Sequence, residues 1–370
     1  MGNPKKILVT GGPVHAYLDA VKIITNKFRG GMMAQLADDL HQTGTSVTYL
    51  TAKGATKIPK WTEVIFHDGF QDYRDKVRDL AAKHDATILG AAVANLIPLN
   101  PWKGKFPSHN FKPGDRIPID FTIAPRVIDD VKTHAPNTML FGYKLLSGVS
   151  HEELIEAAWG VLRESKAQAI IANDASNLDA KFIVTRERGV HSLQANQLAG
   201  FIQAMLADTY WCSEPGIMFP PTPQEEAQLR DALTTFSATC DPTTFFPTHG
   251  ELRFGSIAMR SQGGTFLTTS RGKNELASFT RFTTAPNNHV IYPSQGPKAS
   301  LNAPLLARIL QANPDVHCVV HGHVQWPNLP TQPYAPPGTV RDTDRDVSQP
   351  FNIEGHGCFL FPDPQMKVIQ

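Results

Sequence analysis

The alternation of apolar and polar positions divides the first half of the chain into strands and helices that follow one another in turn. Short runs of β-branched and other apolar residues predict strands at 7–10, 46–51, 86–94, 138–143 and 169–174. Apolar residues at helical spacing predict helices at 34–41, 73–84 and 151–165. This order indicates an α/β domain in which helices cover both faces of a parallel sheet.

Two glycine turns mark the opening of this domain. Gly11 and Gly12 follow the first predicted strand, and Gly30 and Gly31 precede the first predicted helix. Glycine lets backbone N–H groups approach a phosphate closely, so the turns indicate a nucleotide at the carboxyl ends of the strands. An ordinary strand–helix unit with loop glycines remains the alternative interpretation. Polar residues that could face such a ligand are Asp19, Lys22 and Asn26, and, at the same sheet edge, Asn95, Asn173 and Asp174.

A proline-rich stretch divides the chain. Residues 211–223 contain prolines and a glycine between helical patterns, which predicts a linker. Thr222 then has the features of a helix N-cap, with proline at the first helical position and Glu225 at the third. We therefore expect domains at 1–210 and 224–370. A helix predicted at 194–210 fits either the first domain or a subunit interface.

Charge, apolar runs and cysteine spacing limit the kinds of partner that the chain is expected to have. The chain has 370 residues and a formal net charge of +1, with no long run of like charges, so neither nucleic acid nor a membrane is expected as a partner. No apolar run approaches the roughly 20 residues that span a bilayer, and no secretory signal precedes the first strand, which predicts a cytoplasmic protein. The four cysteines lack CxxC spacing, so no disulfide framework is expected. The expected partners are a small substrate, a nucleotide and further copies of the chain in a homo-oligomer.

Eight short blocks in order give the first half a family resemblance. The blocks are T-G-G at 10–12, L-D-A-V-K at 18–22, I-T-N at 24–26, R-G-G-M at 29–32, A-A-V-A-N at 91–95, G-K-F at 104–106, Y-K-L at 143–145 and I-A-N-D at 171–174. Together they resemble phosphopantothenoylcysteine synthetase, the ligase of coenzyme A biosynthesis. The resemblance implies a Rossmann-like three-layer domain that uses CTP or ATP with Mg²⁺ to activate a carboxylate as an acyl-nucleotidylate, which an amine then attacks.

The resemblance also implies roles for individual residues. Asn26 stands where the family asparagine contacts the activated acyl group, and Lys105 stands where an essential lysine meets triphosphate charge. The nucleotide-binding positions carried over are Gly11, Gly12, Lys22, Gly30, Ala91, Asn95, Tyr143 and Lys144. Three positions depart from the family: Lys22 replaces an arginine, Asn95 replaces an aspartate and Leu146 replaces an acid. The lost acids put the binding of the same nucleotide and its metal in doubt.

A histidine pair distinguishes the second half. His321 and His323 lie in a strand-like run, so alternation places both on one face, and His356 is a third candidate. Three histidines with one open position describe a catalytic type of zinc site. A satisfied surface pair is the alternative interpretation.

The surroundings of these histidines resemble the class II aldolases and their adducin relatives, over about residues 225–362. The blocks are G-S-I-A-M-R at 255–260, F-L-T-T-S-R-G at 266–272, N-P-D-V-H-C-V-V-H-G-H at 313–323, Y-A-P-P-G-T at 334–339 and E-G-H-G at 354–357. The resemblance implies zinc on the three histidines, and a glutamate 19 positions before His321 as acid/base; Asn302 stands there instead. An amide cannot take a proton at neutral pH, so aldol chemistry loses its base. Positions expected around a substrate are Ser256, Ser270, Gly272 and Asn302.

Three functions follow from these resemblances. The favoured one is a triphosphate-dependent acid–amine ligase whose aldolase-like second domain binds metal or substrate. The second is a divalent-metal lyase or isomerase that acts on a phosphorylated or nucleotide-linked hydroxy-carbonyl compound. The third is a non-catalytic protein that binds nucleotide without turnover.

Overall fold

A computed structural model describes residues 4–362, and these fall into two compact units that divide between Leu206 and Ala207. The predicted domains differ from these units in their boundary, because residues of the expected linker form a strand of the second unit. The outer ends of both predicted domains, 1–3 and 363–370, lie outside the described residues. Within 4–362, no helix has the length and apolar character needed to cross a bilayer.

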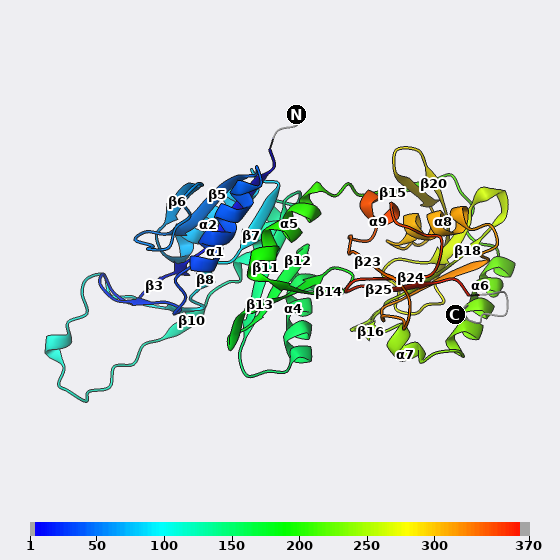
Figure 1. Ribbon diagram of the computed structural model, residues 1–370. Helices are drawn as coiled ribbons and strands as arrows, with labels where there is room; N and C mark the ends of the chain where they lie inside the picture. Colours follow the sequence, from blue (N-terminus) through cyan, green and yellow to red (C-terminus); the bar gives the residue numbers. More distant parts are fainter. Residues whose placement is uncertain (1–3, 363–370) are drawn as a thin grey trace. The chain divides into compact units, whose positions relative to one another are not determined.

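The first unit is built on an eight-stranded sheet of order β14-β13-β12-β11-β7-β1-β5-β6 (Figure 1). Its six strands from β12 to β6 pair in parallel, and β13 and β14 add an antiparallel edge. The strands are β1 (Lys6–Thr10), β5 (Ser46–Ala52), β6 (Glu63–His67), β7 (Ala86–Leu89), β11 (Met139–Leu146), β12 (Ala169–Asp174), β13 (Asn177–Thr185) and β14 (Val190–Gln194). The predicted parallel α/β sheet is confirmed.

Helices cover both faces of this sheet. Apolar residues of α1 and α5 form a buried core with the strands, which includes Met33, Leu36, Leu198 and Ile202. Helix α3 packs against both α2 and α4. The helices are α1 (Gly31–Gln42), α2 (Gly69–Ala81), α3 (Val127–His134), α4 (His151–Ser165) and α5 (Leu198–Ala207). The result is a three-layer arrangement.

Three pairs of short strands follow the carboxyl ends of the strands of the first sheet. They are β2 (Pro13–Val14) with β8 (Ala92–Val93), β3 (Ala16–Tyr17) with β4 (Ile23–Ile24), and β9 (Leu96–Pro98) with β10 (Phe121–Ile123). Figure 1 shows the cyan segment between β9 and β10 as a long excursion from the sheet. Short strands and loops, not long regular elements, therefore surround the predicted ligand edge.

The second unit contains a nine-stranded sheet of order β15-β21-β20-β19-β18-β22-β25-β24-β23. Its strands are β15 (Cys212–Gly216), β18 (Ser256–Arg260), β19 (Phe266–Thr269), β20 (Phe279–Ala285), β21 (His289–Pro293), β22 (Cys318–Gly322), β23 (Thr331–Gln332), β24 (Phe351–Ile353) and β25 (Gly357–Leu360), with a separate hairpin of β16 (Thr248–His249) and β17 (Leu252–Arg253). The helices are α6 (Pro223–Ser237), α7 (Pro242–Phe245), α8 (Ala303–Ala312) and α9 (Val340–Thr343). Apolar side chains of α6 and α7 form a buried core with the sheet, while α8 contacts β18, β20 and β22.

Three predicted elements differ from the structure. The strand expected at 86–94 ends at Leu89, and residues 92–93 form the separate bridge to β2. The helix expected at 194–210 is only Leu198–Ala207, because β14 continues to Gln194. Residues 212–216 of the expected linker pair in parallel with β21 as an edge strand.

Candidate functional site

The two glycine turns of the first unit lie against each other. Gly12 and Gly30 adopt φ values of 77° and 84°, which side chains rarely tolerate. A Cβ built on Gly30 would lie 2.5 Å from the Gly12 nitrogen and 2.6 Å from its Cα. A Cβ on Gly11 would lie 2.1 Å from the Tyr49 hydroxyl. The contact therefore depends on glycine at these positions.

Helix α1 starts at this contact. Gly30 is its N-cap and supplies no side-chain hydrogen bond to the first turn. A Cβ on Gly31 would have no neighbour within 4 Å, so the space beside the first turn is open. The free N–H groups and the helix dipole favour an anion at such an end. Phosphate binding at this helix end stays a prediction.

The segment after β7 joins the same edge. The Ala92 N–H donates to the Gly12 carbonyl at 2.9 Å. Asn26, predicted to be catalytic, donates from Nδ2 to the Val93 carbonyl at 2.9 Å. Asn26 is exposed, and this bond uses only one of its two amide protons. Residues 26, 30 and 91–95 are thus brought together with the first glycine turn.

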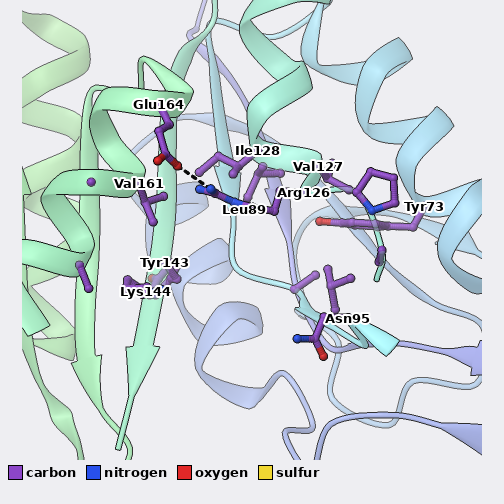
Figure 2. Close-up of a pocket in the computed structure, with 16 residues that line it drawn as sticks. Tyr73, Leu89, Asn95, Arg126, Val127, Ile128, Tyr143, Lys144, Val161 and Glu164 are labelled. Atoms are coloured by element: carbon purple, nitrogen blue, oxygen red, sulfur yellow. Dashed lines mark hydrogen bonds and ion pairs between the residues drawn. The ribbon is translucent and has the colours of Figure 1, made fainter. Parts of the chain in front are cut away.

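A cavity of about 520 Å³ opens beside this segment, at the carboxyl ends of β7 and β11 and under α3 and α4 (Figure 2). This volume is in the range of small-molecule sites. Four predicted nucleotide-binding residues line it: Ala91, Asn95, Tyr143 and Lys144. Burial raises the pKa of Tyr143, so its phenol stays protonated at neutral pH.

Sequence reasoning missed three polar residues of this cavity. Arg126 Nη1 lies 2.5 Å from a carboxylate oxygen of Glu164, and Figure 2 shows this ion pair at the cavity. Tyr73 also lines the cavity, and its hydroxyl lies 3.1 Å from Thr10 Oγ1. Arg126 caps α3, Glu164 lies on α4 and Tyr73 on α2, outside every block that carried the resemblance. No local sequence signal marks them.

Asp19 does not face a ligand, contrary to the interpretation of it as a ligand-facing residue. Its buried carboxylate accepts hydrogen bonds from the N–H groups of Val21 and Lys22, from Lys22 Nζ and from the Phe106 N–H, at 2.6, 2.5, 2.9 and 2.9 Å. Burial alone would raise the pKa of Asp19, but these hydrogen bonds outweigh it and hold the pKa well below its usual range. Asp19 is therefore a structural anchor for the turn at 18–22.

The same turn fixes the backbone around Lys105. The residues on either side of Lys105 both dock on the turn: the Ala20 N–H donates to the Gly104 carbonyl at 3.3 Å, and Phe106 binds Asp19. Lys22 Nζ also lies 5.6 Å from the centroid of the Phe106 ring. Lys22 and Lys105 are both exposed, so the 18–22 turn and the segment docked on it carry two cations.

Asn173 and Asp174 close a local turn instead of facing a ligand. The Asn173 amide is buried and donates to the Ala180 carbonyl at 3.0 Å. Asp174 accepts from the N–H and hydroxyl of Ser176, both at 2.8 Å. Their position at the carboxyl edge is as predicted, but their polar atoms stabilise the β12–β13 connection.

Three histidines converge in the second unit. Ligand nitrogens of His321, His323 and His356 lie within 4.8 Å of one another. The ring centroid of His321 lies 5.0 Å from that of His323 and 4.8 Å from that of His356. The predicted grouping of these three side chains is therefore what the fold produces.

His321 is oriented as a metal ligand would be. Its Nδ1 donates to the Cys358 carbonyl at 2.9 Å, because a carbonyl can only accept. Its Nε2 is buried and has no hydrogen-bond partner among residues 4–362. Burial lowers the pKa of His321 to about 4, which keeps the ring neutral with a lone pair on Nε2. The donor set fits zinc.

The predicted substrate residues of this unit differ in what they contact. Ser256 pairs with His321 across β18 and β22, and its buried hydroxyl has no partner in the described chain. Asn302 precedes α8 with a buried Oδ1 that likewise has none among those residues. The Ser270 hydroxyl forms a hydrogen bond of 2.6 Å with the Ser278 hydroxyl, so part of its hydrogen-bonding capacity is already used. Gly272 adopts a φ of 66°.

Lys273, next to Gly272, is a buried cation that sequence reasoning missed. Its Nζ donates to the Gly255 carbonyl at 2.7 Å. Burial lowers its pKa to about 8, and its charge contributes to the low pKa of His321. A lysine directly after the T-S-R-G block was the available signal.

The parallel sheet, the opposed glycine turns and the position of the cavity at the strand ends define the first unit as a Rossmann-like α/β domain. Residues 3–200 match the DNA/pantothenate metabolism flavoprotein C-terminal domain family, and the chain belongs to this family.

Individual relatives cover parts of the chain. The coenzyme A biosynthesis bifunctional protein CoaBC of Thermococcus kodakarensis is 28% identical over 172 residues, which cover 46% of this chain and 41% of that protein. The chain thus spans less than half the length of the curated relatives it matches. The DNA/pantothenate metabolism flavoprotein of Streptococcus pneumoniae gives a TM-score of 0.48 at 21% identity, over 54% of this chain and 96% of that one. An aldolase II superfamily protein of Pseudomonas syringae gives 0.26 at 16% identity, over 38% and 67%.

Proposed function

We propose that the first unit is a nucleoside-triphosphate-dependent ligase that activates a carboxylate for amide formation. The observation that supports this most is the contact between Gly12 and Gly30 at the start of α1, with Asn26 bound to the rim of a 520 Å³ cavity. Backbone N–H groups at a helix start suit phosphate. A positioned amide beside them suits an acyl group on which charge develops.

Cations at the site match the charge of a triphosphate. Lys22 and Lys105 lie at the 18–22 turn, and Lys144 lines the cavity. Lysine supplies a compact point charge to phosphate oxygens or to departing pyrophosphate. We assign triphosphate contacts to Lys22 and Lys105, and contacts to the nucleoside to the cavity residues Ala91, Asn95 and Tyr143.

The proposed reaction has two steps. A carboxylate oxygen of the substrate attacks the α-phosphorus, a new P–O bond forms, and the bond to pyrophosphate breaks. The nitrogen of an amine then attacks the acyl carbon, the nucleoside monophosphate leaves with the bonding electrons, and the amine loses a proton to solvent. Asn26 would donate its remaining N–H to the acyl oxygen, where negative charge appears in the second step.

The residues at this site do not form a Mg²⁺ site of their own. The carboxylate of Asp19 already accepts four hydrogen bonds, and Asn95 occupies the position where an acid was expected. Mg²⁺ is bound in many nucleotide sites chiefly by phosphate oxygens and water. No step of the proposed reaction is assigned to a protein-held magnesium ion.

Pyrophosphate release tests this function. The protein would be incubated with CTP or ATP, Mg²⁺, cysteine and a panel of acids that begins with phosphopantothenate, since a structurally similar protein was solved with phosphopantothenate-cysteine. Release that requires both a nucleotide and one acid supports the ligase. Nucleotide binding without release for any acid would instead support a non-catalytic nucleotide-binding protein.

The three histidines favour a second, metal-dependent function for the C-terminal unit. His321, His323 and His356 would hold zinc, which supplies polarisation of a substrate carbonyl in a lyase or isomerase. Ser256 and Lys273 would then orient an anionic or hydroxylated substrate beside the histidines. Metal analysis of the protein and of His321→Gln tests this function. Reconstituted wild-type protein that holds no more zinc than His321→Gln would count against it.

A further inference from the structure

A second group of metal-ligand side chains lies at the β15 edge of the nine-stranded sheet. It consists of Cys212 and Glu214 on β15 and His289 at the start of β21. One ligand atom of each lies within 4.8 Å of the other two. None of the three belongs to the histidine triad or to the cavity of the first unit.

The backbone holds these three side chains in place. Cys212 pairs with His289 in the parallel register of β15 and β21, and the Cys212 N–H donates to the Asn288 carbonyl at 2.8 Å. Residues two apart on a strand share a face, so Glu214 lies on the same side as Cys212. The donors are thus preorganised by a sheet and not by a loose loop.

The three side chains offer three different ligand atoms, a sulfur, an oxygen and a nitrogen. Cys212 and Glu214 are exposed and His289 is half-buried, so an ion from solvent can reach them. His289 Nδ1 lies 2.8 Å from Glu214 Oε1, which shows that these two side chains already converge. A thiolate, an imidazole and a carboxylate together suit zinc, whereas Mg²⁺ and Ca²⁺ prefer oxygen ligands only.

We propose that Cys212, Glu214 and His289 bind one zinc ion, with water in the fourth position. On binding, the Cys212 thiol releases its proton and forms a metal–sulfur bond. The ion replaces the His289–Glu214 contact with two metal–ligand bonds. The edge strand β15 is thereby fastened to β21 by a metal as well as by backbone hydrogen bonds.

Cobalt titration of the full chain tests this site. Co²⁺ bound to a thiolate gives a charge-transfer absorption in the near ultraviolet, and a site made of histidines alone does not. The wild-type protein should develop this band, and so should a His321→Gln/His323→Gln double variant. Cys212→Ser should abolish the band. Glu214→Gln and His289→Asn should each weaken cobalt binding about tenfold or more.

Cys240→Ser is the matched control, because Cys240 is half-buried and outside the group. It should keep the full band. A band that survives Cys212→Ser, or that disappears in the histidine double variant, would overturn the proposal. Zinc provides a second measurement: it should slow the reaction of Cys212 with a thiol reagent in the wild-type protein and in the histidine double variant, whereas His289→Asn should need about tenfold more zinc or more for the same protection. Equal reaction rates with and without zinc would also overturn it.

Discussion

The catalytic role that we propose for Asn26 rests on two properties of its side chain. One N–H is fixed on the Val93 carbonyl, which orients the amide, and the residue is exposed. The sequence predicted the residue through I-T-N, but the partner that orients it is 67 residues away and became known only from the structure.

Asn26→Ala should lower kcat for nucleotide-dependent amide formation by about 100- to 1,000-fold, the scale of a lost oxyanion donor, with a small change in KM. Steady-state kinetics with saturating nucleotide measures this. Asn137→Ala, just before the amino end of β11 and so at the opposite edge of the sheet, should leave both constants unchanged. Equal loss in the two variants would show a general effect on folding.

Lys273 makes a second prediction at this scale. Its folded-state pKa of about 8 lies below the unfolded value of 10.5, so the unfolded chain binds more protons between these pH values. The cost of burying the charge is fully present below pH 8, and stability rises as the pH increases through this window.

Lys273→Met should therefore raise the free energy of unfolding at pH 7 by about 1–2 kcal/mol, after allowance for the lost bond to the Gly255 carbonyl. It should also flatten the rise between pH 8 and 10. Urea unfolding at pH 7, 9 and 10 measures both effects. Lys298→Met, at an exposed position, should keep the wild-type profile. A destabilised Lys273→Met at pH 7 would contradict this account.

At the scale of elements, the sequence predicted the features that depend on neighbouring residues alone. The spacing of Thr222 and Glu225 predicted a helix N-cap, and both hydrogen bonds of the capping box are present at the start of α6. The early end of β7 was not predictable, since the apolar run continues to Ala94 and only the bridge of 92–93 to β2 breaks it. Likewise, the extension of β14 to Gln194 depends on its pairing with Ala180 in β13.

The same limit applies to the candidate sites. Glycine turns and the H-x-H pair are local patterns, so residue types alone predicted them. The Arg126–Glu164 pair and the Cys212–Glu214–His289 group join segments distant in sequence, and tertiary pairing alone reveals them.

Helix α6 gives a test at this scale. Thr222→Ala removes the hydroxyl that accepts from the Glu225 N–H and should cost about 1 kcal/mol of unfolding free energy. Glu225→Ala should cost more, because the partly buried Arg281 guanidinium loses its carboxylate partner. Chemical unfolding of both variants measures the order. Thr234→Ala, late in α6, is the control and should have a smaller effect.

At the scale of the molecule, the two units have separate cores. One buried cluster joins residues between Ile7 and Met205, and another joins residues between Leu229 and Leu360. A ligand that binds only the folded form stabilises the unit that carries its site, by about 2.7 kcal/mol at 100 times its Kd.

Calorimetry should therefore show that CTP or ATP raises the midpoint of one transition and zinc raises that of another. His321→Gln/His323→Gln should reduce the zinc effect and leave the nucleotide effect intact. A single transition that both ligands raise equally would contradict independent ligand-linked units.

Pro215 gives the edge strand β15 one more property. The Cys212 N–H faces β21, and alternate N–H groups of a parallel strand share that direction, so the nitrogen of Pro215 lies on the outer side. Proline has no hydrogen to offer there, and β15 is the last strand at its end of the sheet. The border of the sheet is thus a poor template for the strand of a neighbouring chain, which protects concentrated protein against growth into fibres.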